Sequence, residues 1–234
     1  MFKIFSDLHL GVRDANDSSN YLVMERWLPR IADSQAKIII AGDLFDITEN
    51  TGPFEFSQDC LDRIREAHYP IASLIADLEA EGRCTIIEGN HDWGLGHGEG
   101  LTLTQGNKFF KVLHGHQWDG INSGAGRSIG ETLTKVGAFL EAFWPQGPSL
   151  IEDSFRDKEL RAYDERVDIY ARAMNGAIQD EGGPTEEVVI VGHSHRPGVH
   201  KHHINAGCWT WNRCDVVTVY DDGRVVLGSA EDDL

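Results

Sequence analysis

The sequence predicts an α/β fold in which buried strands alternate with helices. Three observations predict this class. Short apolar runs recur along the chain, each run ends in Gly, Asp, Asn or His, and amphipathic patterns lie between the runs. Continuous apolar runs bounded by turn signals are typical of strands buried on both faces, and their alternation with helices is typical of β–α–β units.

The expected strands follow the chain in order. FKIF precedes SDLH, KIIIA precedes GDLFD, CTIIE precedes GNHD, FFKVL precedes HGH, and VVIV precedes GHSH. Two helices are expected between these runs, over Phe56 to Glu81 and over Tyr21 to Ala32, the latter with apolar positions Leu22, Trp27, Leu28 and Ile31. Near the C-terminus, DVVTVYDDGRVVL has two strand patterns around an Asp-Gly turn, which predicts a hairpin.

The regular succession of short apolar runs stops between Asp119 and Thr185. There the stretch ETLTKVGAFLEAFW gathers apolar residues near one helical face, namely Leu133, Val136, Gly137, Leu140, Phe143 and Trp144. We expect a single domain over residues 1–234, with residues 119–185 as a helical insertion that forms a lid. The alternative is that these helices only pack on the core, as most amphipathic helices do.

Length and net charge limit the number of domains and the kinds of partner that the chain can have. With 234 residues, 41% of them hydrophobic, the chain can bury one sizeable core. Acidic residues number 38 against 21 basic ones, and the formal charge of −17 disfavours general binding of nucleic acid. A phosphorylated substrate stays possible, because divalent metals would reverse the sign of the field locally.

Cysteine usage and the absence of targeting segments point to the cytoplasm. The four cysteines include no CxxC pair, and we expect reduced thiols. The start MFKIFSDLHLG lacks the pattern of a signal peptide, and no apolar run reaches the roughly 20 residues of a membrane span. Contact with a membrane surface stays open, and the sequence does not indicate an oligomeric state.

Metal-ligand residues follow five of the expected strands. In parallel α/β sheets, functional groups collect outside the carboxyl ends of the strands, so these residues are expected to converge. Residues two apart in an extended segment point to the same side, which would bring each D-x-H or H-x-H pair together. The candidates are Asp7 and His9, Asp43, Asn90 with His91 and Asp92, His114, and His193 with His195.

The number of donors favours two ions. Two carboxylates, one amide and four imidazoles exceed the needs of one four-coordinate zinc, and they suit two ions with open positions for water and substrate. Oxygen and nitrogen donors without thiolate favour manganese, iron, zinc or magnesium, and geometry alone does not choose among these ions.

These motifs resemble the calcineurin-like metallophosphoesterase superfamily. Its ordered pattern D-x-H, G-D, G-N-H-D, H and G-H-x-H is matched from Asp7 to His195. The resemblance implies a four-layer α/β/β/α sandwich and phosphoester hydrolysis by a metal-bridged hydroxide. It assigns one ion to Asp7, His9, Asp43 and His195, and the other to Asp43, Asn90, His114 and His193. It also makes His91 the acid that protonates the leaving oxygen and Asp92 the residue that orients His91.

Within the superfamily, the ligand spacing, GHSHRPGVH and the insertion look like UDP-2,3-diacylglucosamine diphosphatases. That resemblance implies a lipid diphosphate substrate, manganese and a lid that holds acyl chains. That family commonly has Arg where this chain has His91. The alternatives are therefore a phosphodiesterase or phosphatase acting on a small soluble or protein substrate, and a metal-binding interaction module without turnover.

Overall fold

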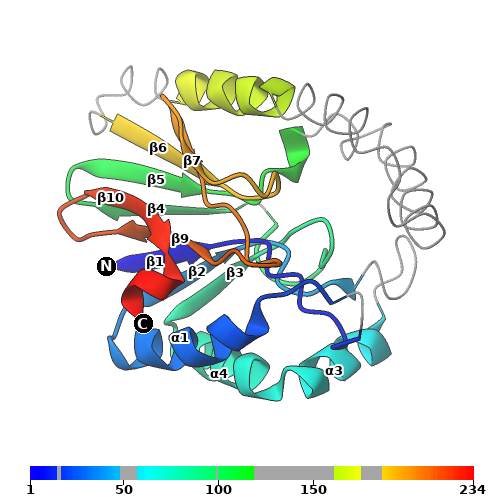
Figure 1. Cartoon of the computed structure of the whole chain (residues 1–234). Helices are drawn as coiled ribbons and strands as arrows, with labels where there is room; N and C mark the ends of the chain where they lie inside the picture. Colours follow the sequence, from blue (N-terminus) through cyan, green and yellow to red (C-terminus); the bar gives the residue numbers. More distant parts are fainter. Residues whose placement is uncertain (15–16, 48–56, 99, 119–160, 175–185) are drawn as a thin grey trace.

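The computed structural model describes two packed β-sheets with helices on their outer faces (Figure 1). It describes residues 1–14, 17–47, 57–98, 100–118, 161–174 and 186–234. Five strands form one sheet in the order β10-β9-β1-β2-β3, and five form the other in the order β4-β5-β6-β8-β7. The predicted α/β class is confirmed.

The first sheet is built from the N-terminal and C-terminal parts of the chain. Its parallel centre consists of β1 (Phe2–Phe5), β2 (Lys37–Ala41) and β3 (Cys84–Ile87). β9 (Asp215–Val219) joins β1 antiparallel and pairs with β10 (Val225–Ser229), which confirms the predicted hairpin. The runs FKIF, KIIIA and CTII are thus strands, as predicted.

The second sheet has a parallel centre of its own. β5 (Lys108–Val112), β6 (Glu186–Val191) and β8 (His203–Asn205) run parallel. β4 (Leu101–Gln105) pairs antiparallel with β5, and β7 (Gly198–Val199) pairs antiparallel with β8. The alternating sequence LTLTQ of β4 carries a period-2 signal that the search for continuous apolar runs misses.

The outer face of the first sheet is covered by α1 (Tyr21–Asp33), α3 (Gln58–Ala67) and α4 (Tyr69–Ala80). α1 buries Trp27, Leu28 and Ile31 as predicted, whereas Leu22 is 63% exposed because Val23 and Met24 face the core instead. The prediction of one helix from Phe56 to Glu81 is wrong. The helical stretch is interrupted at His68. Pro70, in the first turn of α4, has no backbone N–H and so cannot donate the hydrogen bond to α3 that a continuous helix requires.

An apolar layer between the sheets holds the sandwich together. It contains Ile4 and Ile39 from the first sheet and Phe110, Val112 and Ile190 from the second. On the far side of the second sheet, a helix over residues 161–174 buries Tyr163, Val167 and Ala171 (Figure 1). The four layers α/β/β/α are therefore present.

The insertion is described only in part. The helix at 161–174 packs on the sheet with its buried face, which is the alternative to a lid for this stretch. The candidate lid residues Leu133, Val136, Gly137, Leu140, Phe143 and Trp144 lie outside the described residues.

Two further features concern the expected environment of the chain. All four cysteines are buried and unpaired, and Cys84 lies in a strand as expected. Within the described ranges, none of the helices combines the length and the apolar character that crossing a membrane requires. Two 3₁₀ turns, His116–Trp118 and Ala230–Asp233, complete the described elements.

Candidate metal centre

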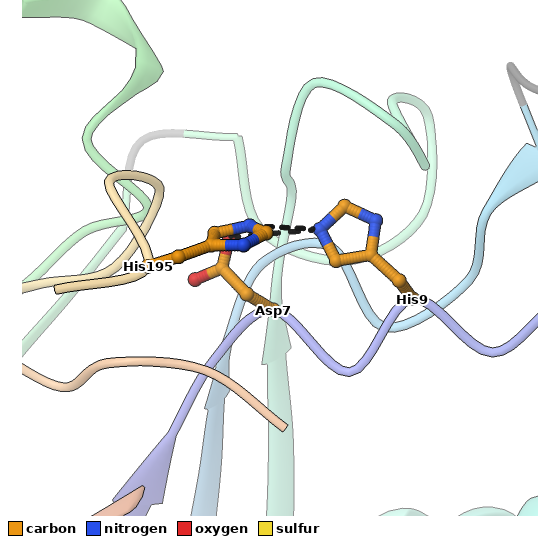
Figure 2. Close-up of side chains that lie close together, drawn as sticks. All are labelled: Asp7, His9 and His195. Atoms are coloured by element: carbon orange, nitrogen blue, oxygen red, sulfur yellow. Dashed lines mark hydrogen bonds and ion pairs between the residues drawn. The ribbon is translucent and has the colours of Figure 1, made fainter. Parts of the chain in front are cut away.

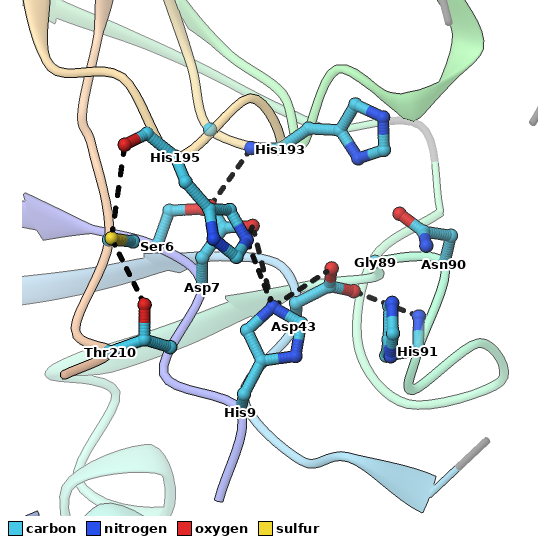
Figure 3. Close-up of polar contacts among 12 residues, drawn as sticks. Ser6, Asp7, His9, Asp43, Gly89, Asn90, His91, His193, His195 and Thr210 are labelled. Atoms are coloured by element: carbon cyan, nitrogen blue, oxygen red, sulfur yellow. Dashed lines mark hydrogen bonds and ion pairs between the residues drawn. The ribbon is translucent and has the colours of Figure 1, made fainter. Parts of the chain in front are cut away.

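The ligand-type residues of five separate segments meet at one edge of the sandwich. Figure 3 shows those of the loops that follow β1, β2, β3 and β6. Each segment is the loop that follows a parallel strand, and the strands β1, β2, β3, β5 and β6 all end at this edge (Figure 1). The residues brought together are Asp7, His9, Asp43, Asn90, His114, His193 and His195.

The first group consists of Asp7, His9 and His195 (Figure 2). The Nε2 atoms of His9 and His195 lie 3.1 Å apart, and the His195 Nε2 lies 3.2 Å from Asp7 Oδ1. The backbone N–H of His193 donates to the other oxygen, Asp7 Oδ2, over 2.9 Å. Asp7 is thereby fixed, with Oδ1 directed toward the two imidazoles.

The second group consists of Asp43, His114 and His193. His114 Nε2 lies 3.2 Å from Asp43 Oδ2 and 3.0 Å from Asn90 Oδ1. The other ring nitrogen, Nδ1, donates to the carbonyl of Ala41 over 2.9 Å. Such a backbone contact fixes the tautomer of a metal-binding histidine and leaves Nε2 as the ligand atom.

Asp43 lies between the two groups. Its Oδ2 is 3.2 Å from His114 Nε2 in the second group and 3.7 Å from His9 Nε2 in the first. Its Oδ1 accepts the backbone N–H of His91 over 2.9 Å, which fixes the carboxylate in this position. The Asp43 carboxylate therefore lies close to imidazoles of both groups.

These donors fit divalent cations. Asp7 is fully buried, and among the described residues its Oδ1 accepts no hydrogen bond, although His195 Nε2 is close. A buried carboxylate oxygen without a donor is costly unless a cation neutralises it. The grouped donors are imidazole nitrogens and carboxylate oxygens, which suit manganese, iron or zinc.

The backbone of the ligand loops is left-handed. Among the described non-glycine residues with positive φ are Asp7 (56°), His9 (48°), Asp43 (51°), His193 (69°) and His195 (56°). The prediction that extended backbone brings the residues of each D-x-H or H-x-H pair together is therefore wrong, although these residues do lie close to one another. The strands end before Asp7 and His193, and the left-handed turns bring residues two apart to the same cluster.

The glycines of the motifs make room for these turns. A Cβ on Gly89 would lie 2.1 Å from Asp43 Oδ1, and a Cβ on Gly192 would lie 1.8 Å from Ser6 Oγ. Because no real Cβ tolerates such distances, these positions need glycine for close approach of the backbone.

The carboxylates and imidazoles shift one another's pKa values. Burial alone would raise the pKa of Asp43, but the charges of His114 and His91 hold it well below its usual range. Burial would lower the pKa of His114, yet the charge of Asp43 and their hydrogen bond raise it to about 9. Divalent ions would compete with these protons, because histidine must be deprotonated to bind metal.

His91 lies beside the first group, with its side chain 20% exposed. Its Nδ1 lies 2.8 Å from Asp46 Oδ1, and its ring is 4.6 Å from the ring of His9. Burial lowers the pKa of His91, but the charges of Asp43 and Asp46 outweigh burial and raise it. Asp46 thus holds the His91 imidazole at the rim of the cluster.

The predicted contact of Asp92 with His91 is replaced by a contact with Asp46. Asp92 Oδ2 accepts the backbone N–H of Leu44 over 2.7 Å, and its Oδ1 accepts that of Gly89 over 2.9 Å. Asp92 therefore ties the loops after β2 and β3 together. The signal for Asp46 in the sequence is its place three residues after Asp43, where helix capping is an equal explanation.

Comparisons with known proteins agree with this geometry. The model of the calcineurin-like phosphoesterase family matches residues 1–197, which include every ligand-type position from Asp7 to His195. Comparison with curated proteins gives no match.

Similar solved structures include two phosphoesterases and a sorting protein. A predicted phosphoesterase from Streptococcus pneumoniae TIGR4 shares 16% identity, with a TM-score of 0.42 and coverage of 98% of this chain and 89% of that one. Yfce, a phosphoesterase from E. coli, shares 15%, with a TM-score of 0.45 and 98% of both chains covered. Vps29 from Entamoeba histolytica complexed with zinc shares 14%, with a TM-score of 0.37 and coverage of 97% and 96%.

Proposed function

Because this chain belongs to the calcineurin-like phosphoesterase family, and is therefore a metal-dependent phosphoester hydrolase, we propose that it uses two adjacent divalent ions to cleave a diphosphate. The observation that carries the proposal is the position of Asp43. Its Oδ2 lies 3.7 Å from His9 in one group of donors and 3.2 Å from His114 in the other. A carboxylate in this position can bind both ions at once.

Each ion has its own donors in the proposal. Asp7, His9, Asp43 and His195 would hold the first, and Asp43, Asn90, His114 and His193 the second. When bound, the ions supply positive charge that activates water near neutral pH and offsets the charge growing on the phosphoryl oxygens. We propose Mn²⁺ as the ion, because nitrogen and oxygen donors suit it and the lipid diphosphatases that the motifs resemble use manganese.

The chain itself supplies the proton. Asp46 holds His91 through Nδ1, so Nε2 is the atom that we propose protonates the leaving oxygen. A general acid must carry its proton at the working pH, and the surrounding carboxylates raise the pKa of His91, which favours the protonated imidazole. Asp92 connects the loops that follow β2 and β3 by accepting backbone N–H groups, and it takes no part in proton transfer in this proposal.

The substrate that we propose is a lipid diphosphate such as UDP-2,3-diacylglucosamine. The support is the helical pattern of the insertion at residues 119–185, which begins a few residues after the proposed ligand His114. The insertion ends at the start of β6, which lies at the opposite edge of the sheet because β5 and β6 run parallel. Each methylene of an acyl chain buried there would contribute about 0.8 kcal/mol to binding. Such a substrate would bring the enzyme to the cytoplasmic surface of a membrane. The charge of −17 disfavours nucleic acid as a partner.

A small soluble phosphoester is the second candidate, and two observations favour it. His91 stands where the lipid diphosphatases commonly have Arg. In addition, the described part of the insertion buries Val167 and Ala171 against the sheet, so this apolar face is not available to an acyl chain.

A substrate panel tests the proposal. The purified enzyme is assayed with a long-chain lipid-linked diphosphate, its short-chain analogue, a nucleoside diphosphate and an aryl phosphodiester, each with Mn²⁺ and with a chelator. We expect metal-dependent turnover that is fastest for the long-chain diphosphate. Equal rates for long and short chains would move the assignment to the soluble phosphoester.

Variants of the insertion sharpen the same test. Leu140→Asp and Phe143→Asp should remove the preference for long chains while leaving hydrolysis of the aryl phosphodiester intact. Ile169→Asp is the matched control, because Ile169 lies in the described helix and is 59% exposed. If all three variants retain the chain-length preference, the acyl chain does not bind at Leu140 and Phe143.

A further inference from the structure

A second cluster of metal-ligand residues lies away from the metal centre, between the helix at 161–174 and the β7–β8 hairpin. It consists of Asp164 from the helix and His200 and His203 from the hairpin, and their ligand atoms lie within 4.8 Å of one another. His203 opens β8, which pairs with β6 in the sheet that this helix covers. None of these residues belongs to the centre described above.

The orientation of His203 is that of a metal ligand. Its side chain is fully buried, and its Nδ1 lies 2.9 Å from Asp168 Oδ1, one helical turn from Asp164. A carboxylate that accepts the Nδ1–H of a histidine fixes the tautomer whose Nε2 carries a lone pair. This pairing is typical of metal-binding histidines.

Within the part of the chain that the structure describes, the other nitrogen of His203 has no hydrogen-bond partner. Nε2 is buried, and Asp164 Oδ1, the nearest carboxylate oxygen, is 3.7 Å away, which is too far for a hydrogen bond. A metal ion bound at Nε2 would satisfy this buried atom, which lies near the ligand atoms of Asp164 and His200.

His200 completes the arrangement. Its ring stacks on that of His203, with centroids 4.2 Å apart and an angle of 5° between the planes. The hairpin turn holds this pair, because the backbone N–H of His200 donates to the carbonyl of His203 over 2.9 Å. The ligand atoms of His200, His203 and Asp164 thus lie close together, and the His200 ring would turn out of the stack to direct a nitrogen at a shared ion.

We propose that Asp164, His200 and His203 bind a divalent transition-metal ion of the zinc class, with Asp168 orienting His203. Imidazole and carboxylate donors select such ions over magnesium or calcium, which prefer oxygen ligands alone. The ion would join the helix at 161–174 to the β7–β8 hairpin. It would therefore stabilise the outer layer of the second sheet, since a ligand that binds only the folded state raises its stability.

Zinc itself is the probe for this site. Wild type, His200→Ala, Asp164→Asn and the control His202→Ala are loaded with Zn²⁺, dialysed, and analysed for metal per chain by mass spectrometry. His202 is the matched control because it neighbours the cluster and is not part of it. We expect His200→Ala and Asp164→Asn each to hold one zinc fewer than wild type, and His202→Ala to hold the same number. The main centre is unchanged in all four proteins, so the difference reports the second cluster alone.

Two further measurements keep the result interpretable. Circular dichroism checks the fold of each variant. His200→Ala is expected to disturb the fold less than Asp164→Asn, because His200 is partly exposed on a short hairpin. Crystals of wild type loaded with zinc should show an anomalous scattering peak between Asp164, His200 and His203. Equal zinc content in all four proteins, or crystals without a peak at this place, would overturn the proposal.

Discussion

Five of the seven residues proposed to bind metal adopt a backbone conformation that most side chains avoid. Asp7, His9, Asp43, His193 and His195 all have φ between 48° and 69°. A left-handed residue with a Cβ costs roughly 1–2 kcal/mol, and glycine does not bear this cost. The surrounding hydrogen bonds hold these turns, and bound ions would offset the cost further.

The first prediction isolates this backbone strain. With metal removed by a chelator, His195→Gly should be more stable than His195→Ala by about 1–2 kcal/mol, because only glycine accepts a φ of 56° without strain. Both variants lack the imidazole, so the comparison separates strain from loss of the side chain. Urea unfolding of the two proteins measures the difference. An alanine variant as stable as the glycine variant would show that the turn at residue 195 is not strained.

The second prediction concerns proton transfer by His91. His91→Ala should keep its metals and lose roughly 10²–10⁴ in rate on substrates with poor leaving groups, since general acid catalysis contributes on this scale. The loss should shrink for aryl substrates, whose leaving oxygen needs no proton. Steady-state rates over a series of leaving groups provide the measurement. A uniform loss across the series would remove His91 from the acid role.

Asp46 and Asp92 give a third, paired prediction. Asp46 contacts His91 Nδ1, whereas Asp92 accepts backbone N–H groups of Leu44 and Gly89. Asp46→Asn should therefore reproduce the leaving-group dependence of His91→Ala in a weaker form. Asp92→Asn should instead lower the stability of the protein, with a leaving-group dependence like that of wild type. The reverse pattern would restore Asp92 as the partner of His91.

At the scale of elements, the loop before α1 is fastened to the junction of α3 and α4. Asp17 Oδ2 lies 3.0 Å from the Nε2 of His68, the residue at which the helical stretch breaks. The rings of Tyr21 and His68 pack edge to face, and Arg13 Nε donates to His68 Nδ1 over 3.4 Å. One buried histidine therefore connects the loop with two helices.

This contact makes stability depend on pH. Burial would raise the pKa of Asp17, but hydrogen bonds from His68 and Ser19 outweigh burial and lower it to about 2. A carboxyl whose pKa is lower in the folded state stabilises that state fully above its unfolded pKa of about 3.9. This contribution is then lost as the pH falls toward 2.

The fourth prediction follows from the lowered pKa of Asp17 in the folded state. Wild type should exceed Asp17→Asn in stability at pH 6, and the gap should shrink between pH 4 and pH 2. Urea unfolding of both proteins over this range measures the gap. A gap that stays constant down to pH 2 would mean that the carboxylate charge of Asp17 contributes nothing to stability.

Sequence patterns predict elements where one signal dominates. The buried strands carry continuous apolar runs, such as Ile38 to Ile40, and the residues proposed as ligands follow the ends of these strands. The break at His68 is less visible, because Pro70 is also compatible with the first turn of a helix. β4 is missed because its exposed threonines alternate with half-buried leucines. The left-handed turns have no signal in periodicity, and the contact of Asp46 with His91 depends on tertiary structure.

At the scale of the whole molecule, the two sheets present their ligands at a common edge. β1, β2 and β3 run parallel in one sheet, and β5 and β6 run parallel in the other. The apolar layer between the sheets fixes their relative position, so the loops of both contribute to one site (Figure 1). Asp7 and Asp43 come from the first sheet, whereas His114, His193 and His195 come from the second.

The central claim is that two ions bind side by side and share Asp43. Electron paramagnetic resonance of the enzyme saturated with Mn²⁺ tests it most directly, because two Mn²⁺ ions with a common ligand are magnetically coupled. We predict the spectrum of a coupled pair in wild type. Its loss is expected in Asp43→Asn, whose amide cannot replace a carboxylate that lies between His9 and His114. A wild-type enzyme that is saturated and active yet gives only the spectrum of isolated Mn²⁺ would contradict the account.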